Sequence, residues 1–283
     1  MPNALVIRAP GTNCDAEMCR AFELAGARVT LLHIDRLIAD PARIEAFELL
    51  GFPGGFSYGD DIASGRVLAM KARERLFPHL RAAVVRGCAV IGACNGFQVL
   101  VQVGLLPGPL GGEAWTDATQ PEQTCSLSEN IAGRFCDRWV GMEYEPSSVC
   151  VWTRGLAEGP VIRTPKGEDS RLDSATLRTI NQLPVAHGEG RFTTLTPSVT
   201  RDLERAGQVA VRYTDNYNGS EGAIAGICDS TGRVFGLMPH PERYLDWTRH
   251  PYWTRLPASL KSLETPGLRM FRNAVEAVAH APV

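Results

Sequence analysis

The sequence predicts an α/β fold: a mostly parallel open sheet flanked by helices, continued by a mixed or antiparallel β extension. In the first hundred residues, short apolar runs alternate with amphipathic helical segments, which is the pattern of parallel strands joined by crossover helices. From about Leu105 onward, glycine, proline and short β-like runs replace this alternation. Such a sequence pattern favours strands joined by turns. Because no low-complexity linker interrupts the 283 residues, we expect a single domain over 1–283.

The N-terminal part is expected to supply the parallel strands and their helices. Asn13 is a plausible N-cap for the first helix, and Gly26 lies just past its end. Pro78 should break the third helical stretch. The expected strands are 4–11, 27–34, 47–55 and 88–94, and the helical segments are 13–26, around 42–46, 66–87 and 95–104.

The C-terminal part is expected to be rich in strands and to close with a helix. The segments "YNGSEG" and "DSTGR" are turn signals between β-like runs. The runs are 131–140, 147–153, 180–190, 208–216, 223–229 and 233–240, and the closing helix is 266–280.

Composition excludes several classes of protein. The chain is 44% apolar and 21% charged, with a formal net charge of −2 and no long basic run, so we expect neither a nucleic-acid partner nor a membrane surface. The N-terminus lacks a basic region followed by a long apolar one. Eight cysteines are dispersed without Cys-x-x-Cys pairs or zinc-ligand spacing, which favours free thiols in the cytoplasm and no metal site.

One of these cysteines stands on a tight corner, in "VIGACNGFQVL" at residues 90–100. Glycines two residues before and two after Cys94 suit a strand that turns abruptly into a helix, as in a nucleophile elbow. The helix N-terminus would stabilise a thiolate, and the N–H of Asn95 could point at an oxyanion. The alternative is an ordinary turn with an incidental buried cysteine.

A cysteine nucleophile needs a base and a group that orients the base. Two histidines are followed at the second position by glutamate, in "HGEG" (His187, Glu189) and "HPER" (His240, Glu242). The second pair is favoured because an apolar strand delivers His240 to its end and Pro241 biases it toward extended geometry. Extended residues two apart project to the same side, so the glutamate can reach the imidazole. The alternative for this segment is a strand-ending turn with a solvated glutamate.

Two further residues are candidates for binding substrate. Gly55 follows a strand that runs into two glycines and is the best candidate for a second oxyanion amide, although a flexible loop explains the glycines equally well. Gln98 lies one helical turn beyond Cys94 and could hydrogen-bond a polar substrate.

Together these residues resemble class I glutamine amidotransferases. "GACNGFQ" with a later "HPE" matches their Cys-His-Glu triad, and the match narrows to the glutaminase subunits of phosphoribosylformylglycinamidine synthase, an enzyme of purine biosynthesis. The motifs "APGTNCD", "FPGGFSYGD", "PVAHGEGR", "RYTDNYNGS" and "GLMPHPER" occur in the order of that family. The resemblance covers residues 4 to 244 and the segment "FRNAVEAV".

The resemblance implies a role for each candidate. Cys94 would be the nucleophile, His240 the base and then acid, and Glu242 its orienting partner. The oxyanion amides would come from Gly55 and Asn95, the substrate contact from Gln98, and His187 would lie near the pocket mouth or the partner interface.

The resemblance also implies partners. The chain would hydrolyse glutamine and pass ammonia to a large synthase subunit, with a small third subunit as a further partner. No cofactor is expected on this chain, and ATP and magnesium would belong to the synthase subunit. Segments near 141–180 and 245–265 are longer than in a minimal subunit of the family.

Two other functions are compatible with the residues alone. A different cysteine hydrolase on an α/β sheet would cleave an ester or thioester, although such folds usually place the acid before the histidine. A non-catalytic regulatory subunit could retain the fold, although an intact Cys/His/Glu set argues against it.

Overall fold

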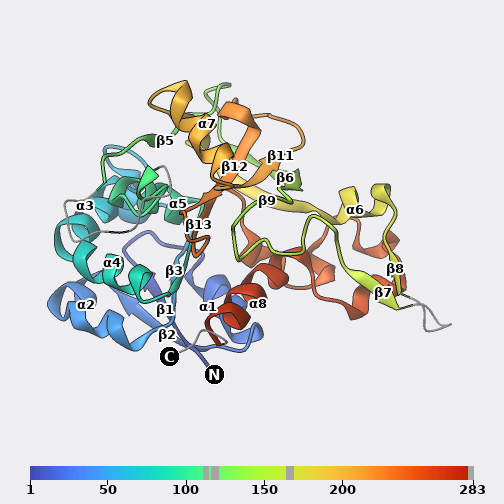
Figure 1. Cartoon of the computed structure of the whole chain (residues 1–283), viewed down its shortest axis with the longest axis horizontal. Helices are drawn as coiled ribbons and strands as arrows, with labels where there is room; N and C mark the ends of the chain where they lie inside the picture. Colours follow the sequence, from blue (N-terminus) through green and yellow to red (C-terminus); the bar gives the residue numbers. More distant parts are fainter. Residues whose placement is uncertain (111–114, 116–120, 164–168, 280–283) are drawn as a thin grey trace.

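The protein is organised around one nine-stranded sheet. The computed structural model describes residues 1–110, 115, 121–163 and 169–279. Within these ranges, the strand order is β2-β1-β3-β4-β13-β12-β11-β6-β9 (Figure 1). The fold class predicted from the sequence is confirmed, since strands from the N-terminal part form one half of the sheet and strands from the C-terminal part extend it.

The two halves of the sheet differ in direction and meet at β13. On one side of β13 the neighbouring strands pair in parallel, and on the other side they pair antiparallel. The parallel half contains β1 (Asn3–Arg8), β2 (Arg28–His33), β3 (Leu49–Phe52), β4 (Ala89–Ala93) and β13 (Val234–Leu237). The antiparallel half adds β12 (Ile224–Cys228), β11 (Val209–Tyr213), β6 (Cys136–Tyr144) and β9 (Gln182–His187). Two small antiparallel pairs are β5 (Cys125–Ser128) with β10 (Arg191–Thr194), and β7 (Val161–Arg163) with β8 (Asp169–Arg171).

Helices cover both faces of the parallel half. Along β1, Ala4 and Val6 join one core while Leu5 and Ile7 join the other, because successive side chains of a strand point to opposite faces. The first core contains α1 (Asp15–Leu24) and α8 (Pro266–Ala279). The second contains α2 (Ile34–Ala39), α3 (Arg66–Arg75), α4 (Phe77–Val85) and α5 (Asn95–Val103). Among the described residues of the C-terminal part, the α-helices before α8 are α6 (Ser174–Ile180) and α7 (Pro197–Arg205).

One local expectation was wrong and two others were confirmed. The run 147–153 forms turns instead of a strand, and its Trp152 is buried in the core against Phe22 and Phe271. The helical segment expected around 42–46 is present as a 3₁₀ helix over Pro41–Ala46, and helix α2 before it was not expected. The break expected near Pro78 is also present: the stretch 66–87 is interrupted at Leu76, and Pro78 lies in the first turn of α4, where a missing N–H has no consequence.

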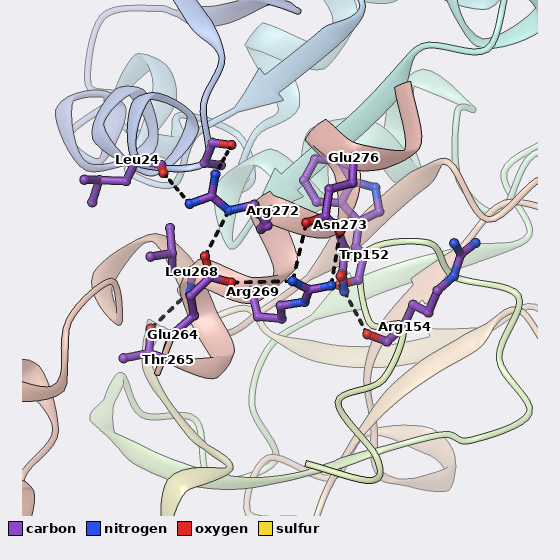
Figure 2. A network of polar contacts seen from close by, with 11 residues as sticks. Leu24, Trp152, Arg154, Glu264, Thr265, Leu268, Arg269, Arg272, Asn273 and Glu276 are labelled. Atoms are coloured by element: carbon purple, nitrogen blue, oxygen red, sulfur yellow. Dashed lines mark hydrogen bonds and ion pairs between the residues drawn. The ribbon is translucent and has the colours of Figure 1, made fainter. Parts of the chain in front are cut away.

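Helix α8 joins distant parts of the chain (Figure 2). Arg272 donates to the carbonyl oxygens of Leu24 and Ala25 at the end of α1. Asn273 donates to the carbonyls of Trp152 and Arg154. At its start, α8 packs on the segment after β13, since a Cβ on Gly267 would lie 2.4 Å from backbone oxygens there.

None of the helices in the described ranges is long and apolar enough to cross a membrane.

Candidate active site

Cys94 occupies the corner between β4 and α5 with an unusual backbone. Its φ of 50° and ψ of −109° lie outside the regions that most side chains adopt. The flanking glycines are required by close approach: a Cβ on Gly96 would lie 1.8 Å from the carbonyl oxygen of Phe52, and one on Gly92 would lie 2.6 Å from the backbone of Gly96. The Cys94 amide donates to the carbonyl of Leu237 at 2.8 Å. The expected strand–turn–helix corner is therefore present, and it is anchored to β13.

His240 and Glu242 form a buried dyad next to this corner. His240 Nδ1 lies 2.6 Å from Glu242 Oε1, and each residue is 1% exposed. The His240 amide donates to the carbonyl of Pro184 in β9 at 2.8 Å. The pairing of His240 with Glu242 is thus observed, while no comparable pairing exists between His187 and Glu189 in the described structure.

The electrostatics of the dyad stabilise the imidazolium that forms when His240 accepts a proton. Burial alone would lower the pKa of His240, but the carboxylate of Glu242 and the thiols of Cys94 and Cys14 outweigh it, so the pKa lies well above its ordinary value. His240 Nε2 has no hydrogen-bond partner of good geometry within the described residues. This nitrogen is consequently available to exchange a proton with Cys94.

Gly55 and Asn95 present backbone amides near the corner. Gly55 has a φ of +139°, a conformation that suits glycine, and hydrogen bonds from Asn13 to Gly54 and from Phe56 to Gly11 hold its turn. Asn95 is the first residue of α5, where an N–H has no intrahelical acceptor. Their roles as oxyanion donors stay predictions.

Gln98 is buried behind Cys94 and is held by protein atoms. Its Nε2 donates to the carbonyl of Glu189 at 2.5 Å, and its Oε1 accepts from Asn95 Nδ2 at 3.0 Å. In this arrangement both ends of the amide are occupied, so a contact between Gln98 and glutamine stays a prediction.

His187 is 3% exposed, and its expected place near the pocket mouth or the partner interface stays a prediction. Its Nδ1 is paired with Asn130 Oδ1 at 3.1 Å and its Nε2 with the Tyr217 hydroxyl at 2.7 Å. Burial lowers the pKa of His187 to about 4, assisted by the charge of His240. The ring is therefore a neutral, internally satisfied group.

Two features of the site were not expected from the sequence. Cys94 Sγ donates to the carbonyl of Ala186 at 3.6 Å, which places β9 over the thiol. Cys14 lies 3.9 Å from His240 Nδ1. The motif "GTNCD" offered a signal for Cys14, but a dispersed cysteine is more simply interpreted as packing.

Cys14, His240 and Glu242 are also the one group of potential metal ligands in the described part of the chain, with ligand atoms within 4.8 Å of one another. The hydrogen bond between the last two already accounts for their proximity. A cavity of about 440 Å³ is lined by residues such as Arg154, Asn181 and Arg269, and Cys94 is not among its lining residues.

A buried cysteine, histidine and glutamate beside the sheet of an α/β fold define a class, the enzymes with a cysteine nucleophile, which includes the cysteine-dependent amidotransferases. Comparison with known proteins identifies the family. The model of the CobB/CobQ-like glutamine amidotransferase domain matches residues 1–175 and 168–278. The chain belongs to this glutamine amidotransferase family and, within it, to the PurQ subunits of phosphoribosylformylglycinamidine synthase.

The relatives match over nearly their whole length. The PurQ subunit of Dehalococcoides mccartyi is 40% identical over 96% of both chains, and that of Methanococcus maripaludis is 35% identical over 98% of both. A solved structure of PurLQS from Thermotoga maritima has a TM-score of 0.66 and 29% identity, covering 97% of this chain and 98% of that one. A glutamine amidotransferase structure from the same organism, with 16% identity, 99% coverage of both chains and a TM-score of 0.52, supports the fold alone.

Proposed function

We propose that this chain is the glutaminase subunit that hydrolyses glutamine and supplies ammonia to a separate synthase subunit, which converts formylglycinamide ribonucleotide to formylglycinamidine ribonucleotide. The observation that carries the proposal is the buried dyad of His240 and Glu242 beside the strained Cys94 corner, in a chain whose relatives are subunits of that synthase.

The first half of the reaction forms a thioester. Cys94 gives its proton to His240 Nε2, and the thiolate attacks the carbonyl carbon of the glutamine side chain. The amides of Gly55 and Asn95 would receive the oxyanion. His240 then returns the proton to the leaving nitrogen, the C–N bond breaks, and ammonia departs.

The second half restores the enzyme. Neutral His240 takes a proton from water, and the hydroxide attacks the thioester carbon. Collapse of this second oxyanion breaks the C–S bond and releases glutamate, while the proton returns to Cys94. Throughout, Glu242 stays ionised, fixes the tautomer of His240 and stabilises the imidazolium.

The other components belong to partners. The synthase subunit would bind ATP and magnesium and perform the amidine-forming step, and a small third subunit would complete the assembly. The PurLQS structure from Thermotoga maritima supports assembly with a synthase subunit. A cytoplasmic location is part of the same proposal.

The test compares nitrogen sources in the assembled complex. Cys94→Ala should abolish glutamine-dependent synthesis, because no thioester can form, while synthesis with ammonium salt continues at the wild-type rate. Cys88→Ala, which removes a buried thiol just before the same strand, is the matched control and should retain both activities. Glutamine-dependent synthesis by Cys94→Ala would refute the proposal.

Two further outcomes would favour the alternatives. Hydrolysis of esters without release of ammonia from glutamine would indicate a different cysteine hydrolase. Failure of a glutamine-mimicking electrophile to modify Cys94 in the complex would indicate a regulatory subunit.

A further inference from the structure

A second cysteine lies beside the His240–Glu242 dyad and has no part in the mechanism above. Cys14 is fully buried at the N-terminus of α1. Its Sγ lies 3.9 Å from His240 Nδ1, the nitrogen that is bonded to Glu242. The sulfur thus touches the edge of the ring opposite the nitrogen that serves Cys94.

The backbone of Cys14 is tied to the glycine turn that precedes Gly55. The Cys14 amide donates to the carbonyl of Gly54 at 3.2 Å. A Cβ on Gly54 would lie 2.6 Å from His240 Cε1 and 3.3 Å from Cys14 Sγ. Sulfur, imidazole and glycine therefore fill one small space, and a displacement of the sulfur would free the ring to move.

Two polar groups fix the sulfur itself. Arg243 Nη2 donates to Cys14 Sγ at 3.0 Å, and Sγ donates to Asn13 Oδ1 at 3.2 Å. Arg243 is adjacent in sequence to Glu242 and interacts with its charge. The guanidinium of Arg243 thus interacts with both Cys14 and Glu242, the two groups that contact His240 Nδ1.

The helix that carries Cys14 is anchored at its other end as well. Arg272 in α8 holds the carbonyls of Leu24 and Ala25 (Figure 2). Helix α8 also packs against the carbonyls of Pro241 and Tyr244, next to the dyad. The same helix therefore contacts both α1 and the segment that carries His240 and Glu242.

We propose that Cys14 is a positioning residue for the glutaminase reaction, whose sulfur, held by Arg243, keeps the His240 ring in the plane that serves both Glu242 and Cys94. This role rests on the proposed function. It differs from simple packing because it acts on the proton affinity and orientation of His240.

The charged and titratable groups around His240 define the expected pH effect. They are Glu242 and Arg243 on its own segment, Cys14 on α1, Cys94 at the corner and His187 on β9. The contact with Cys14 is one of those that raise the pKa of His240. Without the sulfur, His240⁺ should lose its proton at lower pH, and the alkaline limb of kcat/KM for glutamine should move toward lower pH.

The experiment uses the assembled complex with Cys14→Ala, Cys14→Ser and the control Cys19→Ala, which removes a half-buried thiol from the same helix. For Cys14→Ala we expect kcat with glutamine to fall about tenfold through misorientation of the base, with KM within about twofold of wild type. The alkaline limb should shift down, and the rate with ammonium salt should not change. Cys14→Ser retains a hydrogen-bonding atom and should recover part of kcat, and Cys19→Ala should match wild type.

The kinetics of these variants distinguish a positioning role for Cys14 from simple packing. The positioning role is wrong if both Cys14 variants keep the wild-type kcat and the wild-type alkaline limb of kcat/KM. It is also wrong if kcat falls only in proportion to the folded fraction while the alkaline limb of kcat/KM does not shift. If Cys14→Ala does not fold, the limb and kcat of Cys14→Ser decide in the same way. A wild-type complex that cannot use glutamine would instead reject the proposed function.

Discussion

At the scale of single residues, the site depends on backbone positions that admit no side chain. The corner at Cys94 brings α5 against β3 so closely that only a hydrogen atom fits at Gly96. Rigid backbone atoms, unlike the ends of flexible side chains, cannot move aside at low cost. The elbow is therefore held by packing between elements as well as by its own torsion angles.

Gly96→Ala should destabilise the protein severely. Its Cβ would lie 1.8 Å from the carbonyl oxygen of Phe52, so α5 or β3 would have to shift, with a loss of about 3 kcal/mol or more in the free energy of unfolding. Gly188→Ala is the control, because the nearest atom to its Cβ is 3.9 Å away, and it should change stability by about 0.5 kcal/mol or less. Urea denaturation of both variants measures the difference, and equal stabilities would contradict the importance of this close approach.

The sequence was informative about individual residues where chemistry and spacing coincide. "HPE" identified the dyad because a proline and an extended strand end leave few geometries for His240 and Glu242. The role of Cys14 was not predictable, because its contact with His240 joins residues 226 positions apart and no local pattern reports such a distance. The partners of His187 were not predictable for the same reason, because Asn130 and Tyr217 are likewise distant from it in sequence.

At the scale of elements, α8 secures α1 through a polar network at the end of that helix (Figure 2). The last carbonyls of a helix lack intrahelical donors and carry partial negative charge, so a guanidinium is well suited to them. Arg272 supplies two such bonds, at 2.7 and 2.9 Å, and is held in turn by Glu264 at 2.9 Å.

Arg272→Ala should lower the free energy of unfolding by about 2 kcal/mol, because two backbone acceptors lose a charged donor. Arg269→Ala is the matched variant from the same network. Its guanidinium pairs with Glu264 and Glu276 near the surface, and such pairs contribute about 1 kcal/mol or less. Thermal and urea unfolding of the two proteins should place Arg272→Ala clearly below Arg269→Ala. The reverse order would mean that α8 is secured by its apolar face alone.

Elements were predictable where hydrophobic periodicity was strong. The strands of the parallel half follow short apolar runs, and each was expected within a few residues of its observed position. The strand predicted at 147–153 is absent because the apolar residues there belong to a turn. Trp152 fills the core, and its indole donates to the Arg233 carbonyl. Apolar content alone cannot distinguish a strand from a turn that inserts one large ring.

At the scale of the whole molecule, the site lies where the two halves of the sheet meet. Cys94 follows β4, His240 follows β13, and these strands are parallel neighbours, so their carboxyl ends deliver both groups to one edge. Strand β9, far from β13 in the order of the sheet, nevertheless returns over the thiol through the carbonyl of Ala186. The antiparallel extension therefore enlarges the sheet and also contacts the catalytic corner. This contact could not be predicted by examining the strands of the sequence one at a time.

Stability depends on pH through His187, which ends β9 within the antiparallel extension and is buried. The pKa of His187 is lowered by burial to about 4, against an ordinary value of 6.5, so the unfolded chain binds the proton first as pH falls. Between these two values stability must decrease with falling pH, by about 2 kcal/mol from pH 7 to pH 5. The raised pKa of His240 acts in the opposite sense, with a contribution that is complete below its ordinary pKa and declines only as pH rises above it.

His187→Gln isolates this effect, because glutamine retains hydrogen-bonding groups for Asn130 and Tyr217 but does not titrate. Unfolding free energies of wild type and variant, measured by urea denaturation at pH 7 and pH 5, should show a decline that is about 2 kcal/mol smaller in the variant. Other titrating groups cancel in this comparison, since both proteins contain them. Identical declines would show that His187 binds its proton in the folded state as readily as in the unfolded chain, and that burial beside Asn130 and Tyr217 does not keep the ring neutral.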